Sequence, residues 1–268
     1  MIPAGATRAS TTATLGAVVR RLGKVGLLVG VGDGFVGNRV YADYRAQAEF
    51  LLEEGAAVDE VDAAMVALGF AIGPFAVADM SGLDIAWARR KRLAATRDPR
   101  QRYVSIPDRV CEAGRLGRKS GAGWYDYPEG ARRGVPSTVV ADLVESARSE
   151  QGVEPRRISA REIQDRILGS MVAAAATVVF AGVAQRPSDI DVALTEGFAF
   201  PRHLGGPLRA LSRRTSEELV TLLTAVHSSD PVGFSILEPA TRGELPEQVR
   251  VVLKGVAPST HTHEGVPA

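Results

Sequence analysis

The sequence predicts a mainly α-helical protein made of two similar helical lobes, with a short α–β unit at its N-terminus. Three observations support this fold class. The chain after residue 34 has helical patterning throughout, with apolar residues recurring every three or four positions. A single short apolar run, residues 25–31, has the character of a buried strand. One pattern occurs twice, in residues 34–84 and 163–211: a helix, an acidic turn and then a Gly-Phe pair.

The repeated pattern aligns at several separate points. Matching Gly55 with Gly182 places Arg39 on Arg166 and brings the two Gly-Phe pairs within one residue of each other. The offset of roughly 127 residues is far longer than the ~20–50-residue units of solenoid proteins. We therefore interpret the pattern as the internal duplication of a domain.

The composition is that of one large or two ordinary soluble domains. The 268 residues are 45% apolar and 24% charged, and the net charge of +1 arises from both signs mixed along the chain. We therefore expect neither nucleic acid nor an anionic membrane as a partner. The one cysteine, Cys111, excludes an internal disulfide and a cysteine-based zinc site, and it fits a reducing, cytoplasmic location. With four histidines, two of them in the tail, we expect no metal site.

No segment is predicted to cross a membrane or to act as a secretory signal. Residues 1–14 are small and polar, without the apolar core of a signal peptide. About 19 uncharged residues lie between Arg166 and Arg186, close to the ~20 that span a bilayer. They are mostly small residues, and the matching segment of the first copy carries Arg45 and Glu49. We expect a buried core helix there.

The N-terminal unit is predicted to be one helix followed by one strand. Residues 7–23 should form the helix, capped by Ser10 or Thr11 and ended by Gly23. The apolar face of this helix consists of Leu15, Val18, Val19 and Leu22. Residues 25–31 should form the strand.

Residues 32–37 match the G-x-G-x-x-G pattern of dinucleotide-binding loops. That function needs a second strand after the helix and an acidic residue ~20 positions on to bind the ribose. Here the helix continues to Glu54, and no β-branched run follows it. We interpret the glycines as a flexible hinge before the helix rather than as a binding loop for NAD.

Three helices are predicted in the first copy. The first covers residues 36–54, with an apolar face of Val40, Tyr44, Ala48, Leu51 and Leu52. The second covers residues 59–68 and ends at Gly69, and the third covers residues 74–97. The basic run at residues 89–92 is either a solvated helix face or a contact for an anion.

Residues 114–125 are predicted to form a glycine-rich, basic loop. Its four glycines let the backbone turn tightly and approach a neighbour or a ligand closely. Arg115, Arg118 and Lys119 have the chemistry to face phosphate groups. Alternatively, the aromatic pair at the end of the loop pins it to the helices, and the charges stay in solvent.

The second half repeats the helical pattern after a connector. Residues 128–159 form this connector, with a helix at residues 139–147. A capping box at residues 159–162 starts the long helix of the second copy. Thr215 caps a final helix, and from Glu238 onward we expect a largely disordered tail.

Four motifs in this order resemble the 3-hydroxyacyl-CoA dehydrogenase family, above all the duplicated C-terminal region of the multifunctional fatty-acid β-oxidation proteins. The motifs are residues 34–39 (GFVGNR), 73–75 (GPF), 114–125 (GRLGRKSGAGWY) and 201–207 (PRHLGGP). The resemblance spans about residues 7–211 and implies helical lobes like the C-terminal part of 6-phosphogluconate dehydrogenase. It also implies the oxidation of (3S)-3-hydroxyacyl-CoA with NAD, in which the histidine of a His–Glu pair removes the hydroxyl proton.

The resemblance assigns one catalytic-site residue to this chain. By the GFVGNR motif, Asn38 helps to hold the substrate and the catalytic histidine, or else it serves only as the N-cap of its helix. The second copy has Asp165 at that position, which implies a structural duplicate without a site. Arg115, Arg118 and Lys119 are the candidate substrate-binding residues.

The sequence departs from the family pattern at its front. Residues 7–31 correspond only to the last helix and strand of a Rossmann domain, so we expect residues 1–33 to be the remnant of the dinucleotide-binding domain. None of the four histidines lies in the family's catalytic motif. We therefore expect no NAD to bind this chain alone, and no activity from it alone. We expect residues 34–130 and residues 160–237 to form the two helical domains. Residues 131–159 would connect them, and residues 238–268 would form the tail.

These observations favour the substrate-binding and assembly part of a 3-hydroxyacyl-CoA dehydrogenase of fatty-acid β-oxidation. It would bind acyl-CoA within a homo- or hetero-oligomer, once a partner chain supplies the Rossmann domain. The alternative is a non-catalytic helical module, derived from that family, that binds other proteins or acyl-CoA.

Overall fold

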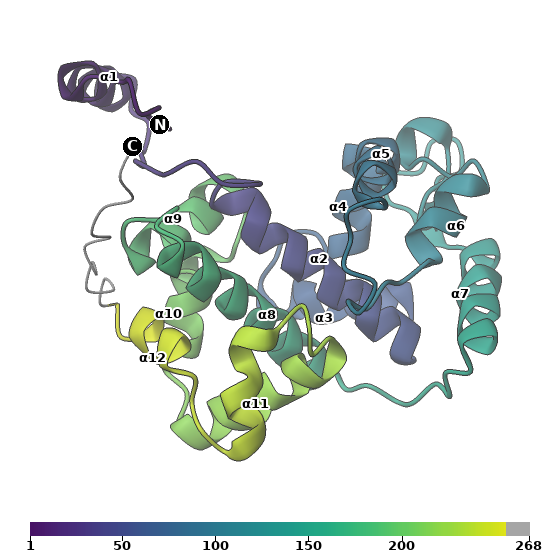
Figure 1. The fold of residues 1–268 in the computed structure, drawn as a ribbon. Coiled ribbons are helices and arrows are strands. Elements are labelled where there is room, and N and C mark those ends of the chain that lie inside the picture. Colours follow the sequence, from purple (N-terminus) through teal and green to yellow (C-terminus); the bar gives the residue numbers. More distant parts are fainter. Residues whose placement is uncertain (256–268) are drawn as a thin grey trace.

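Helices dominate residues 1–255, which are the residues that the computed structural model describes (Figure 1). The first lobe contains α2 (Gly37–Glu54), α3 (Val58–Leu68), α4 (Pro74–Ser81), α5 (Leu83–Leu93), α6 (Ile106–Glu112), η1 (Arg118–Ser120), the antiparallel strands β1 (Tyr125–Asp126) and β2 (Val135–Pro136), and α7 (Thr138–Gln151). The second lobe contains α8 (Ala160–Phe180), α9 (Pro187–Gly197), η2 (Arg202–Leu204), α10 (Pro207–Leu211), α11 (Ser216–Ser229), η3 (Ser235–Arg242) and α12 (Glu247–Leu253). The predicted mainly α-helical fold class is confirmed.

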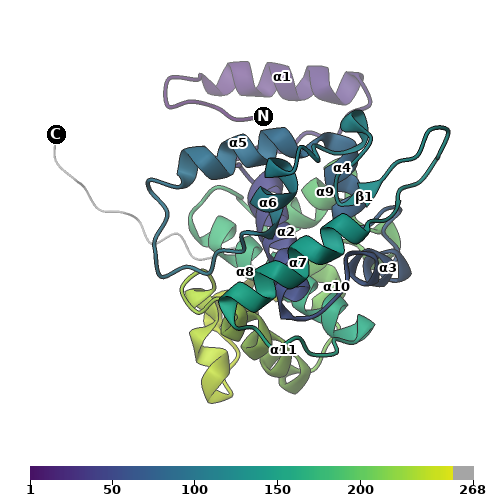
Figure 2. The ribbon, with the colours of Figure 1, turned by 90° about the vertical axis from the view of Figure 1, so that its right-hand side faces the viewer.

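Helices α2 and α8 pack against each other and join the two lobes (Figure 1). Ser170 of α8 donates a hydrogen bond to the Asp43 carbonyl of α2 at 3.3 Å, so the two backbones approach closely. Helix α7 crosses α2 on the outer side of the first lobe (Figure 2). Within residues 1–255, α8 is the one helix long and apolar enough to cross a membrane, and 78% of its apolar window is buried. The prediction of a buried core helix is confirmed.

The last residue of α2, Glu54, is bound by arginines from three parts of the chain. Arg166 of α8 and Arg102 of the first lobe each donate to its carboxylate at 2.8 Å, and Arg156 of the connector donates at 3.2 Å. Burial raises the pKa of Glu54, but the bonds and charges of Arg166 and Arg102 outweigh burial and lower the pKa to about 2. One carboxylate therefore ties both lobes and the connector together.

The two lobes hold their helices with the same contact. Asp62 of α3 accepts hydrogen bonds from two backbone N–H groups in the first turn of α4, both at 2.9 Å. Asp191 of α9 accepts from two N–H groups in the first turn of α10, at 2.9 and 3.1 Å. A carboxylate at a helix N-terminus satisfies unpaired N–H groups and is favoured by the helix dipole. Burial raises the pKa of both aspartates to about 6.

Helix α1 (Ala9–Arg21) lies apart from both lobes (Figure 1). Its N-cap is Arg8, so the prediction that Ser10 or Thr11 caps the helix is wrong. The helix buries none of its residues. The exposed members of its predicted apolar face are Leu15, Val18 and Leu22.

The predicted strand at residues 25–31 does not form. The segment makes an isolated antiparallel bridge between Val29 and Ala184, supported by a 2.8 Å hydrogen bond from the Gly30 N–H to the Val183 carbonyl. Met1 adds two hydrogen bonds, donating to the Leu27 carbonyl at 2.6 Å and accepting from the Val29 N–H at 3.0 Å. A strand needs a partner along its whole length, and within residues 1–255 this segment has only these short contacts.

The predicted helix at residues 74–97 is two helices, α4 and α5. Gly82 separates them with a φ of 86°, a conformation that glycine adopts without steric cost. The Leu83 N–H then donates to the Leu116 carbonyl at 3.2 Å, instead of to the preceding turn. A single glycine therefore redirects the chain within a segment of helical periodicity.

The predicted disorder after Glu238 is wrong for residues 238–255. There η3 packs on α11, and α12 packs on α8. Ala240, Val249 and Val252 are buried in these contacts. Tertiary packing orders a stretch whose proline and charge content favoured disorder. Residues 256–268 lie outside the described part of the chain.

Replacing Arg166 with Met should destabilise the protein by ~1.5–3 kcal/mol, because Glu54 loses its two charge-assisted bonds to a buried guanidinium and keeps only the more exposed Arg102 and Arg156. Urea unfolding measures this change. Arg156→Met is the matched control: this arginine is 48% exposed and binds the same carboxylate, so its loss should cost ~1 kcal/mol or less. Equal effects of the two substitutions would contradict the burial argument.

The pKa of Glu54 also predicts a loss of stability in acid. Its folded value of about 2 lies below the ordinary value of 4.5, so the unfolded chain takes up the proton first as the pH falls. The contribution of Glu54 is complete above pH 4.5 and disappears as the pH approaches 2. Urea midpoints measured across this window should fall more steeply for the wild type than for Glu54→Gln. Identical slopes would assign the acid sensitivity to other groups.

Candidate functional site

Asn38 stands in the first turn of α2. The chain reaches the helix through left-handed backbone at Gly34 and Phe35, with φ values of 73° and 50°. The N-cap of the helix is Val36, so the alternative role of Asn38 as the N-cap is wrong. Asn38 is exposed, and its amide makes no hydrogen bond within residues 1–255, which leaves it available to a ligand.

The glycines before Asn38 are packed against the second lobe. A Cβ at Gly37 would lie 2.1 Å from the Phe198 ring, and a Cβ at Gly32 would lie 2.8 Å from the Val183 side chain. A dinucleotide loop needs its glycines open to the diphosphate. These residues therefore do not fit NAD, and residues 32–37 form a packed turn rather than the flexible hinge that we expected.

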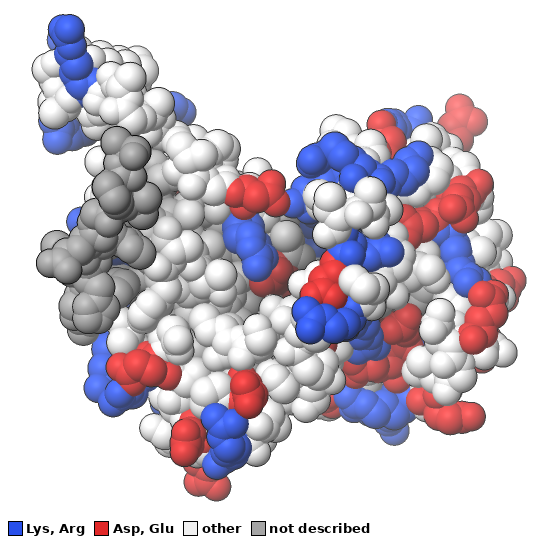
Figure 3. All heavy atoms as spheres, in the orientation of Figure 1, with Lys and Arg blue, Asp and Glu red and all other residues white. Residues whose placement is uncertain are grey.

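Asn38 lines a cleft with a volume of about 540 Å³. Its walls are α2, α5, residues 97–104 and residues 230–234. Figure 3 shows basic side chains gathered over α5 beside this hollow. Six arginines and four carboxylates line the cleft, so its lining carries an excess of positive charge. A concave surface with such an excess favours an anionic ligand.

Four of the six arginines are neutralised by carboxylates. The pairs are Arg39–Asp43 at 2.6 Å, Arg89–Asp33 at 2.6 Å, Arg90–Asp108 at 2.9 Å and Arg102–Glu53 at 2.8 Å. Arg45 and Arg97 form no ion pair within residues 1–255; they lie against Tyr41 and Tyr103 instead.

Neither Arg45 nor Arg97 was assigned a function from the sequence. The sequence places Arg45 within one predicted helix and Arg97 at the end of another, and neither position indicates a function. One available signal was spacing, because Asn38, Tyr41 and Arg45 recur at intervals that place them on one helix face. The approach of Arg97 to that face depends on the turn of the chain after α5, which no local pattern specifies.

A smaller apolar pocket of about 90 Å³ adjoins the cleft. The two cavities share Tyr41, Arg45 and Glu49 as a common wall. The apolar lining includes Phe75, Ala78, Leu83, Trp87, Cys111 and Trp124. Burial raises the pKa of the Cys111 thiol to about 11, so it stays protonated and packs as an apolar group.

The glycine-rich loop 114–125 does not line the cleft. Arg115 is 8% exposed and donates to a carbonyl of the loop at 2.8 Å and to the Asp126 carboxylate at 2.6 Å. Lys119 is exposed and pairs with a carboxylate of α5 at 2.6 Å, while Arg118 is exposed at the surface. Arg115 therefore has a structural role, and the other two remain outside the cleft of Asn38.

Asp79 of α4 holds this loop in place. Its carboxylate accepts hydrogen bonds from the backbone N–H groups of Trp124 and Tyr125 at 2.8 and 3.0 Å. The glycines make room for this contact, because a Cβ at Gly123 would lie 1.9 Å from Asp79 Oδ1 and a Cβ at Gly117 2.5 Å from the Asp79 carbonyl. These contacts favour the interpretation that the aromatic pair pins the loop to the helices.

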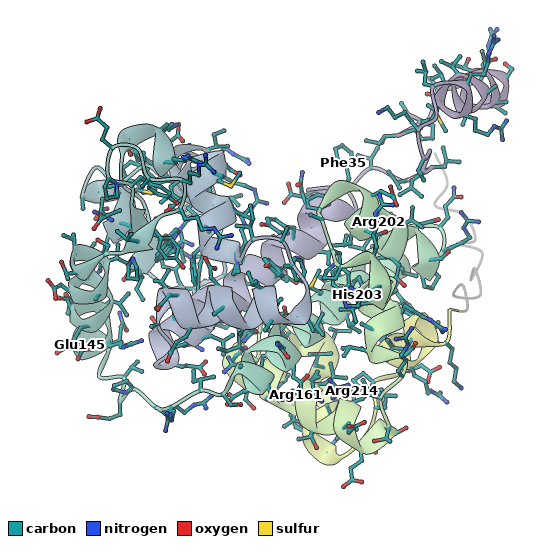
Figure 4. The ribbon with its side chains drawn as sticks, turned by 180° about the vertical axis from the view of Figure 1, so that it is seen from behind. Phe35, Glu145, Arg161, Arg202, His203 and Arg214 are labelled. Atoms are coloured by element: carbon teal, nitrogen blue, oxygen red, sulfur yellow. The ribbon has the colours of Figure 1, made fainter. Side chains whose placement is uncertain are left out.

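Asp165, which aligns with Asn38 in the repeated pattern, accepts hydrogen bonds from two arginines. Arg161 donates to it at 2.7 Å and Arg214 at 2.9 Å, and Figure 4 shows these two side chains near each other. Its carboxylate is therefore engaged within the protein, in contrast to the amide of Asn38. Residues 1–255 contain no group of three or more His, Cys, Asp or Glu side chains placed to hold a metal ion.

Comparison with known proteins gives one consistent similarity. Residues 34–127 match the family model described as 3-hydroxyacyl-CoA dehydrogenase, C-terminal domain. The peroxisomal bifunctional enzyme of Danio rerio is 39% identical over 231 residues, which is 82% of this chain and 32% of that protein. The fatty acid oxidation complex subunit alpha of Shewanella amazonensis is 33% identical over 223 residues, covering 83% of this chain and 31% of that protein.

A solved structure has the same fold. The dehydrogenase part of multifunctional enzyme 1 from C. elegans superposes with a TM-score of 0.65 and 25% identity, over 94% of this chain and 55% of that one. This chain spans about a third of the length of the curated relatives it matches.

Replacing Gly123 with Ala should destabilise the protein by ~1–3 kcal/mol, because the added methyl group overlaps Asp79 and displaces the loop. Thermal or urea unfolding measures this effect. Gly197→Ala is the control, since no atom lies within 4 Å of its Cβ position and alanine favours the helix that it ends. A Gly123→Ala protein as stable as the wild type would show that the loop is not held by Asp79.

Proposed function

We propose that this chain, whose residues 34–127 match the C-terminal domain of the 3-hydroxyacyl-CoA dehydrogenase family, is the substrate-binding and assembly part of such an enzyme. The enzyme would be an NAD-dependent (3S)-3-hydroxyacyl-CoA dehydrogenase of fatty-acid β-oxidation. The relatives support this direction, since their names describe a peroxisomal bifunctional enzyme and a fatty acid oxidation subunit.

The observation that carries the proposal is the position of Asn38. Its exposed amide has no hydrogen-bond partner among the described residues, and it lines an arginine-rich cleft formed mainly by the part of the chain that matches the family. An amide both donates and accepts hydrogen bonds, so it can hold a substrate oxygen and orient a neighbouring catalytic group. We propose that the cleft receives an acyl-CoA and that Asn38 positions its reacting end.

We propose that the NAD-binding domain and the catalytic His–Glu pair are supplied from outside this sequence. NAD accepts the hydride in this reaction when bound, and the packed glycines of residues 32–37 offer it no place here. The exposed apolar face of α1 and the 74% exposed Val31 offer a surface that such a domain would cover. The chain alone would then be inactive.

We also propose that the two lobes arose by internal duplication. The aspartates Asp62 and Asp191 support this, because they cap the following helix in the same way in each lobe. The second helical domain would then extend beyond residue 237 to include α12, which packs on α8. A cytoplasmic location stays a prediction, as the relatives include peroxisomal and bacterial proteins.

The test combines this chain with a separately purified Rossmann domain of a 3-hydroxyacyl-CoA dehydrogenase, NAD and 3-hydroxybutyryl-CoA. We expect NADH formation, measured by its absorbance, at a rate above that of the Rossmann domain alone. Asn38→Ala should lower the added rate by ~10²-fold or more, as the loss of a preorganised hydrogen bond at a reacting centre does.

Gln151→Ala is the matched control, because it removes an exposed amide at the end of α7, away from the cleft. It should leave the rate unchanged. If the mixture makes NADH no faster than the Rossmann domain alone, the split-enzyme proposal fails, and the non-catalytic helical module becomes the better description.

A further inference from the structure

The charges of the cleft point to the part of the ligand that it binds. We propose that Arg45 and Arg97 bind the phosphate groups of the CoA moiety, while Asn38 contacts the reacting thioester end. This inference rests on the proposed function, since it specifies how the same cleft holds an acyl-CoA.

The first argument is that these two arginines form no ion pair within residues 1–255. Both are half-buried in the cleft, and Nε of Arg45 is buried with no hydrogen-bond partner within residues 1–255. A half-buried guanidinium that forms no ion pair is stabilised when an anion binds it. The other four arginines of the cleft each form an ion pair with a carboxylate. Glu49, one turn after Arg45 on α2, forms its ion pair with Arg90 at 3.2 Å, although its charge also acts on Arg45.

The second argument is that Arg97 is held in position without a ligand. Its guanidinium carbon lies 3.5 Å from the ring centre of Tyr103, and that of Arg90 lies 4.4 Å from the same ring. The Tyr103 hydroxyl donates to Asp108 at 2.5 Å, which fixes the ring. Stacking on an aromatic face leaves the in-plane N–H groups of Arg97 available. A planar guanidinium donates two parallel bonds to a phosphate, which a lysine does not.

The third argument is the arrangement along α2. Asn38, Tyr41 and Arg45 share one helix face and line the same cleft. Arg45 follows Asn38 at position i+7, which is ~10 Å along the helix axis. In CoA, the flexible pantetheine arm joins the thioester to the diphosphate, and in a bent conformation it covers this interval. An acyl-CoA can therefore reach both ends of the site at once.

The test is a calorimetric titration of the full chain with butyryl-CoA and with butyryl-pantetheine, which has the same thioester end but no nucleotide phosphates. The wild type should bind butyryl-CoA about 100-fold more tightly, because each charge-assisted contact contributes about tenfold or more. Arg45→Gln and Arg97→Gln should each weaken butyryl-CoA binding about tenfold and leave butyryl-pantetheine binding unchanged. Added salt should weaken only butyryl-CoA binding, which checks the charge effect without any substitution.

Matched controls are Arg118→Gln and Lys119→Gln, which remove the same charges from the glycine-rich loop outside the cleft. They should leave both affinities unchanged. If these two substitutions weaken butyryl-CoA binding and the cleft substitutions do not, the phosphates bind at the loop and the inference is overturned. Melting curves show whether each variant is folded.

The remaining outcomes separate this inference from the proposed function. Equal affinity of the wild type for the two thioesters overturns the phosphate site and leaves the proposed function standing. Failure of both ligands to bind overturns both. ADP binding as tightly as butyryl-CoA indicates a site for free nucleotides instead of a CoA subsite, and it also overturns the inference.

Discussion

The packing of α2 on α8, fastened by the Arg166–Glu54 pair, is the constraint on which the rest of the structure depends. Glu54 is the last residue of α2, where the helix dipole disfavours a negative charge. Two further arginines, Arg102 and Arg156, complete its coordination from the first lobe and the connector. The end of α2 is therefore satisfied only when lobes and connector are assembled together, which couples the folding of segments far apart in the sequence.

Helix α2 also forms a wall of the cleft, so the contacts at Glu54 position that wall. α2 has 18 residues and is ~27 Å long, with Asn38 in its first turn and Glu54 at its last residue. Arg102 belongs to both regions, since it binds Glu54 and also lines the cleft. The wall that carries Asn38 and Arg45 is thus positioned by contacts at the opposite end of the helix. Two arginines that form no ion pair within the described residues, Arg45 and Arg97, lie along this wall.

The elements that were predicted correctly are those whose signals are local. Apolar spacing identified α2 and α3, and Ser159 and Thr215 were recognised as the caps of α8 and α11, where each accepts a backbone hydrogen bond. The errors have a different origin. The helix at residues 74–97 contained a glycine whose conformation breaks it, and the strand at residues 25–31 had no neighbouring strand. The tail around Val249 is ordered by packing on other helices rather than by its own sequence.

The sequence by itself determined the helical fold class, and it predicted the repeated lobes and the candidate site residue Asn38, because periodicity, helix caps and motifs depend on residues close together in the chain. Only the tertiary structure decided which basic residues form ion pairs and which do not. Arg115 lies inside its loop, four arginines of the cleft form ion pairs, and Arg45 and Arg97 form none with the described residues. The charge of a side chain is a property of its residue type, but whether that charge is balanced depends on which distant carboxylate folds beside it.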